Sequence, residues 1–312
     1  MEYESFLSEL SAMAQSGGVR YELNYPFSRI STLRMGGNIP CLVYPKNEDA
    51  MVRAVKICME YGVKFRVIGN SSNIIPPDEV LIPAVISSRR MKGIYALGDG
   101  KTHLRVYAGE QLNSLIIYCM KNSLSGIEKL YGIPATVGGA AAMNAGAFGQ
   151  SVSDCIVNIH CYDITAGKCT DVSAAEAKYS YRESIFADTG KYVILCVDFK
   201  FSEDEQHGGV RTRAMAARRS KDITQPTEKR SAGSIFRRCD AYPPPAYMID
   251  HSSLKGFSIG GAEISKKHAG FMINKGNASE NDFVRLIEYT KKTVEKNFGA
   301  KMVCEVEFFD SN

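Results

Sequence analysis

Residues Gly132 to Gly149 read GIPATVGGAAAMNAGAFG and are the most informative segment of the sequence for the fold. So many residues without bulk indicate that something packs tightly against this backbone. That partner is either another segment of the chain or the pyrophosphate and ring of a dinucleotide. The spacing is not GxGxxG and no P-loop lysine follows, so the segment supports neither a Rossmann site nor a P-loop.

A second loop of small residues, Gly69-Asn70-Ser71-Ser72-Asn73, follows a short strand expected at 64–68. Small residues let the backbone approach a ligand, and N–H groups and serine hydroxyls can then hold phosphate oxygens. Taken alone, the loop is equally well explained as a polar turn. A flavin bound between two subdomains by two separate glycine-rich loops would explain both segments together.

The composition is ordinary for a globular protein of one large domain or two to three modest ones: the 312 residues are 45% hydrophobic and 23% charged. The net charge of +4 is too small for the dense basic face of a nucleic-acid binder. No apolar run is long enough to span a bilayer, and the acidic N-terminus lacks signal-peptide features. We therefore expect a cytoplasmic protein without nucleic-acid or membrane partners.

The nine cysteines are scattered along the chain, and no CxxC pair occurs. This pattern predicts neither a zinc site nor a redox dithiol, so we expect no metal. Most of the thiols are expected to be small, buried side chains.

Hydrophobic periodicity places helices and strands in an order without strict alternation, which indicates an α+β fold rather than a doubly wound one. A polar, glycine-containing stretch at 202–209 marks a domain boundary, and Asn47 is placed to cap a helix. The expected helices are Glu4–Gln15, Glu48–Tyr61, Glu110–Lys121, Val210–Ser220 and Glu280–Asn297. The expected strands are Lys64–Ile68, Val80–Ile86, His103–Ala108, Ile156–Ile164, Tyr192–Phe201 and Met302–Phe309, with a loop at Ser231–Phe236.

Two polar residues stand beside glycine or aromatic residues. Arg182 lies in the aromatic context of YRESIF at 181–186, and Ser234 follows a glycine with Arg237 and Arg238 close behind. In isolation, Arg182 is better explained as a surface arginine beside core aromatics. Ser234 alone is equally typical of a turn that leads into a strand.

Two further residues, Glu305 and His268, carry little meaning by themselves. Strand alternation would point Glu305 and Glu307 to one face, which for a lone carboxylate is usually a solvated face. His268 lies between Lys267 and a glycine-containing turn, and such a histidine is more often structural than catalytic.

Taken together and in order, these segments resemble the UDP-N-acetylenolpyruvoylglucosamine reductases, also called UDP-N-acetylmuramate dehydrogenases, over residues 32–309. The first loop is similar to the family's GxGSN flavin loop, and 132–149 is similar to its GIPGTVGGAxxxNAGAxG segment. Further matches are YRES at 181–184 with YRxS, GSIF at 233–236 with GSxF, residues 260–274 with GGAxVSxxHxxFxxN, and Glu305-Val306 with the terminal PEV. Six motifs in the correct order leave coincidence a poor explanation.

The resemblance implies an α+β fold with a two-subdomain FAD-binding module of the vanillyl-alcohol oxidase (PCMH) type. A C-terminal α+β substrate-binding domain follows it. The implied division is 1–75 and 76–204 for the two flavin subdomains, 205–300 for the substrate domain, and 301–312 for a terminal strand with a catalytic glutamate. The short connection from Arg182 to the strand at Tyr192 resembles the type II subclass, which lacks an inserted loop.

The resemblance also implies an activity. Non-covalently bound FAD is reduced by NADPH as co-substrate and then reduces UDP-N-acetylglucosamine enolpyruvate to UDP-N-acetylmuramate for peptidoglycan. Arg182 and Glu305 are implied to stabilise charge on the substrate carboxylate, and Ser234 to protonate the α carbon. Implied FAD-binding residues are Gly69, Asn70, Ser71, Ser72, Asn73, Gly132, Ile133, Pro134, Thr136, Gly138, Gly139, Ala140, Asn144, Gly146 and Ala147. Implied substrate-binding residues are Tyr181, Arg237, Arg238, Lys267 and His268.

Some positions depart from the family pattern. Ser71 and Ala135 replace glycines, which is tolerable if φ is negative there, and Val303-Cys304 replace Glu-Pro. Two rival functions stay open: another FAD-dependent oxidase of the same module, and a non-catalytic nucleotide-binding relative. Oxygen consumption by the reduced flavin would favour the first, whereas the presence of Arg182, Ser234 and Glu305 argues against the second. A monomer is the default expectation.

Overall fold

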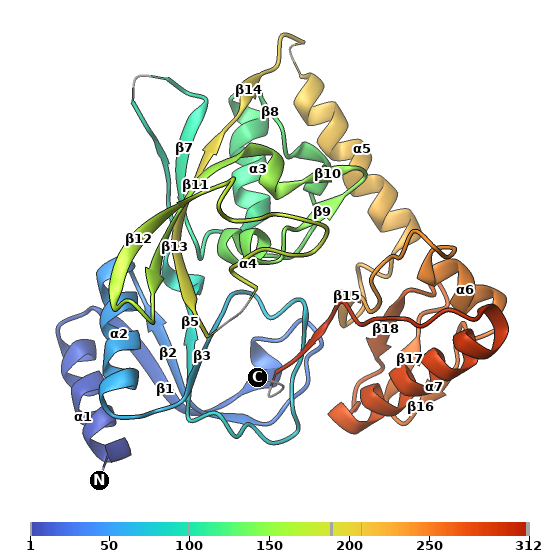
Figure 1. Cartoon of the computed structure of the whole chain (residues 1–312), viewed down its shortest axis with the longest axis horizontal. Coiled ribbons are helices and arrows are strands. Elements are labelled where there is room, and N and C mark those ends of the chain that lie inside the picture. The colour runs from blue at the N-terminus through green and yellow to red at the C-terminus, as the bar shows by residue number, and fades with distance from the viewer. Residues whose placement is uncertain (1, 99, 188–189, 207, 310–312) are drawn as a thin grey trace. The chain divides into compact units, whose positions relative to one another are not determined.

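The computed structural model describes residues 2–98, 100–187, 190–206 and 208–309 and divides into two compact units (Figure 1). The first unit comprises Met1–Leu23, Pro40–Asn70 and Ile82–Arg219, and the second comprises Asn24–Ile39, Ser71–Leu81 and Ser220–Asn312. Among the described residues, none of the helices combines the length and apolarity needed to cross a bilayer. The four-part division inferred from the family stays a prediction.

The N-terminal part of the first unit is a four-stranded sheet with strand order β1-β2-β5-β3. Its strands are β1 (Val19–Pro26), β2 (Asn38–Pro45), β5 (Ala84–Ser87) and β3 (Phe65–Ile68). β5 pairs in parallel with both β2 and β3. Helices α1 (Glu2–Gln15) and α2 (Glu48–Glu60) pack apolar faces into the same core, and Asn47 caps α2 by accepting a 3.0 Å hydrogen bond from Ala50 N.

The larger part of the first unit is a five-stranded antiparallel sheet of order β12-β11-β13-β7-β6. Its strands are β12 (Lys168–Ser173), β11 (Ile156–Asp163), β13 (Tyr192–Lys200), β7 (His103–Tyr107) and β6 (Ile94–Ala96). Helices α3 (Leu112–Lys121) and α4 (Val137–Ala142) pack into its core. Smaller pairs are β8 (Leu124–Ser125) with β14 (Ser202–Glu203) and β9 (Gly146–Ala147) with β10 (Gln150–Ser151). Single 3₁₀ turns occupy Phe27–Arg29, Ser88–Arg90, Glu128–Leu130 and Val152–Cys155.

A charged cluster joins four strands of this five-stranded sheet. The guanidinium of Arg105 on β7 donates two 2.8 Å hydrogen bonds to the carboxylate of Asp198 on β13. His160 on β11 contacts the same carboxylate through Nε2 at 2.9 Å and Asp171 on β12 through Nδ1. Burial disfavours the ionised Asp198, but the hydrogen bonds from Arg105 and His160 outweigh it and lower its pKa to about 2. The hydrogen bond to Asp198 raises the pKa of His160.

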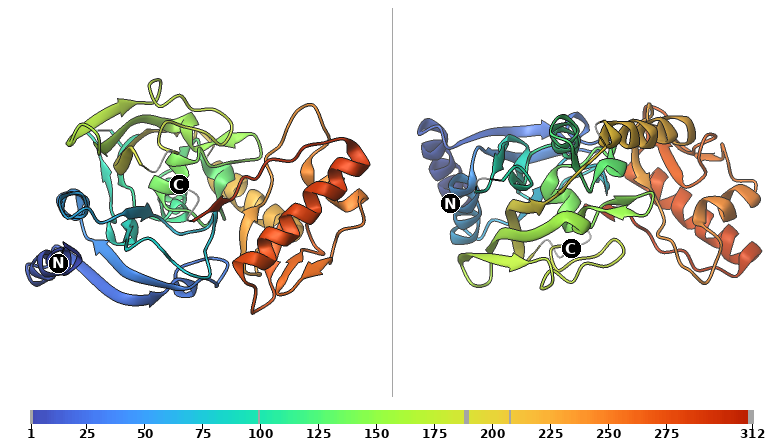
Figure 2. Two further views of the ribbon diagram at one scale, coloured as in Figure 1. Left: turned by 60° about the horizontal axis from the view of Figure 1, so that its bottom comes forward. Right: turned by 90° about the horizontal axis from the view of Figure 1, so that it is seen from above.

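The second unit is built on a four-stranded antiparallel sheet of order β15-β18-β17-β16. Its strands are β15 (Ser231–Ser234), β18 (Phe271–Asn274), β17 (Ala262–Ile264) and β16 (Ser258–Ile259). α6 (Pro245–His251) and α7 (Glu280–Phe298) pack with this sheet, and the red α7 lies across its orange strands in Figure 2. A capping box of Ser279 and Asp282 starts α7, and Gly299 in the left-handed conformation ends it. The long helix α5 (Gly209–Thr224) precedes this sheet in sequence.

A short parallel pair closes the second unit. β4 (Ile74–Ile75) directly follows the first glycine-rich loop and pairs with β19 (Glu307–Phe308) near the end of the chain. The ring of Phe309 is fully buried against the edge of Phe27, with ring centroids 4.9 Å apart. Residues 307–309 are therefore hydrogen-bonded to the segment that directly follows Asn73.

All five expected helices are present, with ends shifted by a few residues, and the strands at 64–68, 103–108, 156–164 and 192–201 are confirmed. The expected strand at Val80–Ile86 begins only at Ala84 because Pro83 lacks the N–H that a ladder needs. Six of the nine cysteines are buried, as expected of small apolar side chains.

Two expectations are wrong. The strand expected at Met302–Phe309 is reduced to β19, because the main chain changes partners: Glu305 N bonds to Ile235 O and Glu307 N bonds to Asn73 O. The expected loop at Ser231–Phe236 contains strand β15, which pairs with β18. The glycine- and alanine-rich stretch, for which no element was predicted, contains a short helix, α4, since Thr136 caps it and alanine favours helix.

Candidate active site

The two glycine-rich segments meet inside the first unit. Asn70 donates from Nδ2 to Gln111 Oε1 at 2.6 Å and to the Pro134 carbonyl at 3.1 Å. A Cβ atom on Gly69 would lie 2.3 Å from Thr136 Oγ1, which is closer than real Cβ contacts come. Glycine at 69 is therefore what allows the first loop to lie directly against the second segment.

Packing within the chain accounts for part of the glycine content of the second segment. Val137 N bonds to Glu110 O and Gly138 N bonds to Ala108 O, each at 2.8 Å, so α4 begins against the turn between β7 and α3. A Cβ on Gly138 would lie 2.8 Å from the Ala108 Cβ. Of the two explanations for this segment, close packing of another chain segment is thus correct at Gly138.

Ser71, in the middle of the first loop, has φ of +51° and lies in the left-handed region. The condition of a negative φ for replacing glycine there is therefore not met, whereas Ala135 has no positive φ. Ser71 is 4% exposed, and its hydroxyl is buried without a hydrogen-bond partner among the described residues. A buried hydroxyl without a partner is costly, so a phosphate oxygen or another ligand acceptor at this loop would satisfy it.

Arg182 lies in the first unit and is tied to the second glycine-rich segment. Its guanidinium donates to the carbonyls of Gly146 at 2.9 Å and Asn144 at 3.3 Å, and it lies over the ring of Tyr181 at 5.2 Å. Its backbone adopts φ of +59°, which is uncommon for a residue with a side chain. Arg182 is therefore a half-buried arginine held by two main-chain carbonyls, and its role at the substrate carboxylate stays a prediction.

Ser234 and Glu305 are neighbours in the second unit although 71 positions separate them in the sequence. Phe236 and Cys304 form an antiparallel bridge, and Glu305 N donates to Ile235 O at 2.7 Å. The side chain of Asn73 donates to Glu305 O at 3.1 Å. Two of the three residues expected to be catalytic are thus held on adjacent segments of one unit, beside a residue of the first loop.

His268 also belongs to this neighbourhood. Its Nδ1 accepts a 3.1 Å hydrogen bond from Gly270 N, and its ring meets the edge of Phe271 on β18, which pairs with Ser234. Burial lowers the pKa of His268, with Lys255 as a further cause, so the neutral ring is favoured at neutral pH. Because Nδ1 accepts, the proton of the neutral ring is on Nε2, which is then a donor.

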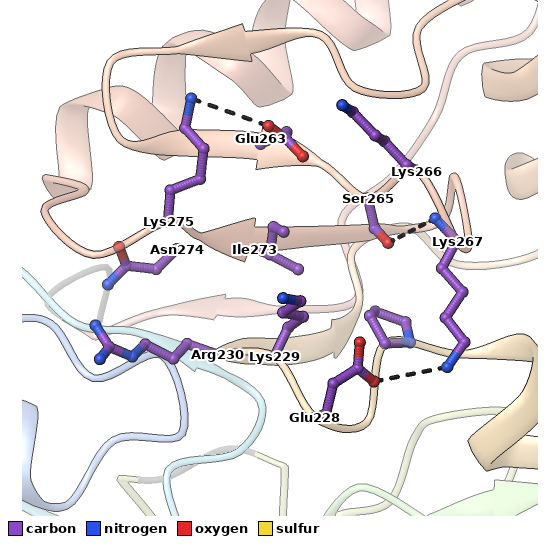
Figure 3. A pocket seen from close by; sticks show the side chains of 11 residues that line it. Glu228, Lys229, Arg230, Glu263, Ser265, Lys266, Lys267, Ile273, Asn274 and Lys275 are labelled. Carbon is purple, nitrogen blue, oxygen red and sulfur yellow. Dashed lines mark hydrogen bonds and ion pairs between the residues drawn. The ribbon is translucent and has the colours of Figure 1, made fainter.

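A basic basin of about 520 Å³ lies on the second unit and is formed at one face of β17 and β18 (Figure 3). Glu263 and Ile273 point from these strands toward it. Lys267 contacts Glu228 at 3.6 Å, and Lys275 contacts Glu263 at 3.9 Å. The complete lining is Pro226, Glu228, Lys229, Arg230, Glu263, Ser265, Lys266, Lys267, Ile273, Asn274 and Lys275.

The basin has an excess of positive charge. Five lysine or arginine side chains line it against two glutamates, and both glutamates already contact a lysine. Of the residues expected to bind substrate, only Lys267 lies here; Arg237 and Arg238 continue from the bridge with Cys304 instead. The pairs Lys229-Arg230 and Lys266-Lys267 were the sequence signal that would have indicated this basin. A cation-rich hollow of this size suits an anionic ligand such as a diphosphate.

Comparisons with known proteins agree with these features. A family model described as FAD binding domain matches residues 39–173, and a model described as UDP-N-acetylenolpyruvoylglucosamine reductase, C-terminal domain, matches residues 225–309. The UDP-N-acetylenolpyruvoylglucosamine reductase of Fervidobacterium nodosum is 34% identical and covers 92% of this chain and 91% of the relative. The protein of the same name from Clostridium novyi is 34% identical, with coverage of 91% and 90%.

A solved structure supports the same conclusion. The crystal structure of UDP-N-acetylenolpyruvylglucosamine reductase from Thermus caldophilus has a TM-score of 0.75 at 27% identity, covering 93% of this chain and 98% of that one. The glycine-rich loops and the FAD-binding match define an FAD-dependent oxidoreductase with a two-subdomain flavin module and a C-terminal α+β domain. The chain belongs to the UDP-N-acetylenolpyruvoylglucosamine reductase family.

The residues of the two loops fit FAD. The absence of a side chain at Gly69 lets the first loop lie directly against Thr136, so that one ligand could be held by residues of both loops. The Ser71 hydroxyl, buried without a partner among the described residues, is a donor that a ligand oxygen would satisfy. None of the described residues forms a group of three or more metal-ligating side chains.

Proposed function

We propose that the chain is an NADPH-dependent, FAD-containing reductase that converts UDP-N-acetylglucosamine enolpyruvate to UDP-N-acetylmuramate in peptidoglycan synthesis. The observation that carries the proposal is the placement of Ser234 and Glu305 on hydrogen-bonded neighbouring segments. A hydroxyl that gives a proton and a carboxyl that meets developing charge are what reduction of an enolpyruvyl group requires.

Residues of the loops 69–73 and 132–149 would hold FAD, which would supply the redox chemistry: hydride transfer from NADPH to the alkene carbon β to the substrate carboxylate. The protein's residues act on the charge and on the proton. Arg182 faces the negative charge that develops on the carboxylate, with Glu305 as its partner. Ser234 then donates its hydroxyl proton to the α carbon of the enediolate-like intermediate.

A serine hydroxyl is a weak acid, so its proton transfer needs support from its surroundings. The carbanionic α carbon is strongly basic, which favours the transfer. The cations that follow Ser234 in sequence, Arg237 and Arg238, are the candidates for stabilising the alkoxide left behind. His268 offers Nε2–H as a hydrogen-bond donor for the substrate.

The basic basin would bind the diphosphate of the nucleotide substrate. The basin is close to Ser234 in the sheet. Ile273 of β18, which lines the basin, pairs with Ser231 at the start of β15, and Ser234 ends the same strand. Several lysine and arginine side chains that converge on one phosphate can replace its hydrogen bonds to water with charge-assisted ones. Lys229, Arg230 and Lys266 would join Lys267 in this contact.

A spectroscopic experiment tests the proposal as a whole. The purified protein should be yellow, lose its visible flavin absorbance when NADPH is added without oxygen, and regain it when UDP-N-acetylglucosamine enolpyruvate is added. Recovery of absorbance without formation of UDP-N-acetylmuramate would contradict the proposal. Rapid oxidation by oxygen instead of by the enolpyruvyl nucleotide would support the rival oxidase.

A further inference from the structure

Gly270 lies between Ser234 and His268, two polar side chains that the proposed function uses. A Cβ atom at this position would lie 3.0 Å from Cε1 and 3.2 Å from Nδ1 of His268, and 3.3 Å from Oγ of Ser234. All three distances are shorter than ordinary van der Waals contacts of a methyl group. The imidazole and the hydroxyl therefore share a space that exists only because residue 270 has no side chain.

The backbone of Gly270 is fixed from both sides. Its carbonyl accepts a 2.9 Å hydrogen bond from Ile235 N, directly after Ser234, and its N–H donates to His268 Nδ1 at 3.1 Å. Gly270 is not in the left-handed region of φ, so glycine is not needed there for backbone conformation. Space for the two side chains is the reason that remains.

We propose that Gly270 is a positioning residue that sets where the Ser234 hydroxyl lies by keeping the gap between Ser234 and His268 open. The inference rests on the proposed function of Ser234 as proton donor. A methyl group in the gap would move the hydroxyl, the imidazole or both by a few tenths of an ångström. Proton transfer depends steeply on such shifts, since about 1 Å of misplacement can cost on the order of 100-fold in rate.

The test is Gly270→Ala in the full-length FAD-loaded protein, with the two half-reactions measured separately. We expect reduction by NADPH at the wild-type rate and a product-forming half-reaction slowed roughly tenfold or more. KM for the enolpyruvyl nucleotide should change less than kcat, because the position of the proton donor is altered. Gly100→Ala is the matched control, since its added Cβ would have no neighbour closer than 4.0 Å.

A double-mutant cycle separates this inference from the proposed function. Removing the Ser234 hydroxyl relieves one of the crowded contacts, so Gly270→Ala should lower the melting temperature less in the Ser234→Ala background than in the wild type. Equal losses in both backgrounds, or a wild-type product-forming rate in Gly270→Ala, would overturn the inference. If Gly270→Ala alone does not fold, the double variant should fold, and failure of both variants would equally overturn it. Normal turnover by Ser234→Ala would instead exclude Ser234 as the proton donor. The double-mutant cycle would still report on the contact between residues 234 and 270, because it measures melting temperatures and not turnover.

Discussion

The main-chain N–H of Glu305 donates a 2.7 Å hydrogen bond to the carbonyl of Ile235, the residue after Ser234. This bond joins Glu305 to the residue that directly follows strand β15. Because it uses main-chain atoms, the side chains of Ser234 and Glu305 can be changed without removing the connection. Variants at these two positions therefore report on chemistry more than on placement.

Ser234→Ala should retain FAD and be reduced by NADPH at the normal rate, yet form no UDP-N-acetylmuramate. The physical reason is that the hydroxyl contributes only to the protonation step, which follows flavin reduction. Stopped-flow absorbance for the first half-reaction and product chromatography for the second would check this. Normal turnover by the variant would exclude Ser234 as the proton donor.

Arg182→Ala and Glu305→Ala should each slow the product-forming half-reaction by roughly 100- to 1,000-fold, because each removes stabilisation of charge at the substrate carboxylate. Arg182 also holds the carbonyls of Asn144 and Gly146, so FAD affinity must be measured alongside. The contacts of Glu305 with Ile235 and Asn73 use its main-chain atoms, which Glu305→Ala retains, so this variant should keep its FAD. Unchanged flavin reoxidation in a pre-steady-state comparison would refute the roles.

Lys229→Ala should raise KM for the enolpyruvyl nucleotide by about tenfold, as expected for the loss of one charge-assisted hydrogen bond to phosphate. Flavin reduction by NADPH should be unaffected, and the increase should shrink at high salt. Lys296→Ala on the exposed surface of α7 is the control with the same loss of charge. Equal effects of the two variants would argue against diphosphate binding in the basin.

Gly69→Ala should weaken FAD binding and destabilise the fold by roughly 1–3 kcal/mol, because a methyl there overlaps Thr136 Oγ1. The yellow colour should be lost during purification, or the melting temperature without added FAD should fall. Gly100→Ala, whose methyl meets open space, should match the wild type in both measurements. A fully loaded, equally stable Gly69→Ala protein would show that the loops separate more easily than the contact implies.

Acid should destabilise the protein through Asp198. Since the pKa of Asp198 is lowered to about 2, its contribution is present above about pH 4, the ordinary carboxyl range, and is lost as pH falls toward 2. The raised pKa of His160 has the opposite pH dependence. Protonated His160 stabilises the fold below about pH 6.5, and this stabilisation is lost as the pH rises through the pKa of His160 in the folded protein.

Asp198→Asn should therefore lower the free energy of unfolding by roughly 2 kcal/mol at neutral pH and flatten its decline below pH 4. Denaturant titrations across pH 2–8 would measure this. Asp171→Asn is the comparison, since Asp171 contacts His160 but is 63% exposed and should matter less. If the free energy of unfolding falls equally below pH 4 in Asp198→Asn and in the wild type, Asp198 is not the cause of that fall.

Sequence patterns predict an element correctly where residues close in sequence fix its ends. The side chain of Asn47 and the pair Ser279–Asp282 fix the helix starts that they cap, so periodicity and capping identified these helices. Ser231–Ser234 could not be recognised as a strand from its own residues. It is a strand because it pairs with β18, which lies some 40 residues later in the sequence.

The site shows the same limit. Ser234 and Glu305 were expected from motifs, but their adjacency arises from a bridge between Phe236 and Cys304 that no local pattern encodes. The left-handed conformation of Ser71 was unexpected, since serine has no particular preference for it. Gly270 and the basic basin were missed altogether, because crowding and concavity are properties of the folded chain and not of any one segment.

The pairing of β4 with β19 has a consequence for how the protein is made. Ile74 and Ile75, which continue the first glycine-rich loop, find their hydrogen-bonding partners only at Glu307 and Phe308. During synthesis on the ribosome, Ile74 and Ile75 have no strand partner until Glu307 and Phe308 have been added to the chain. Contacts between residues so distant in sequence form late in folding. A chain cut short before Glu307 would lack the strand that pairs with β4, directly after the first glycine-rich loop.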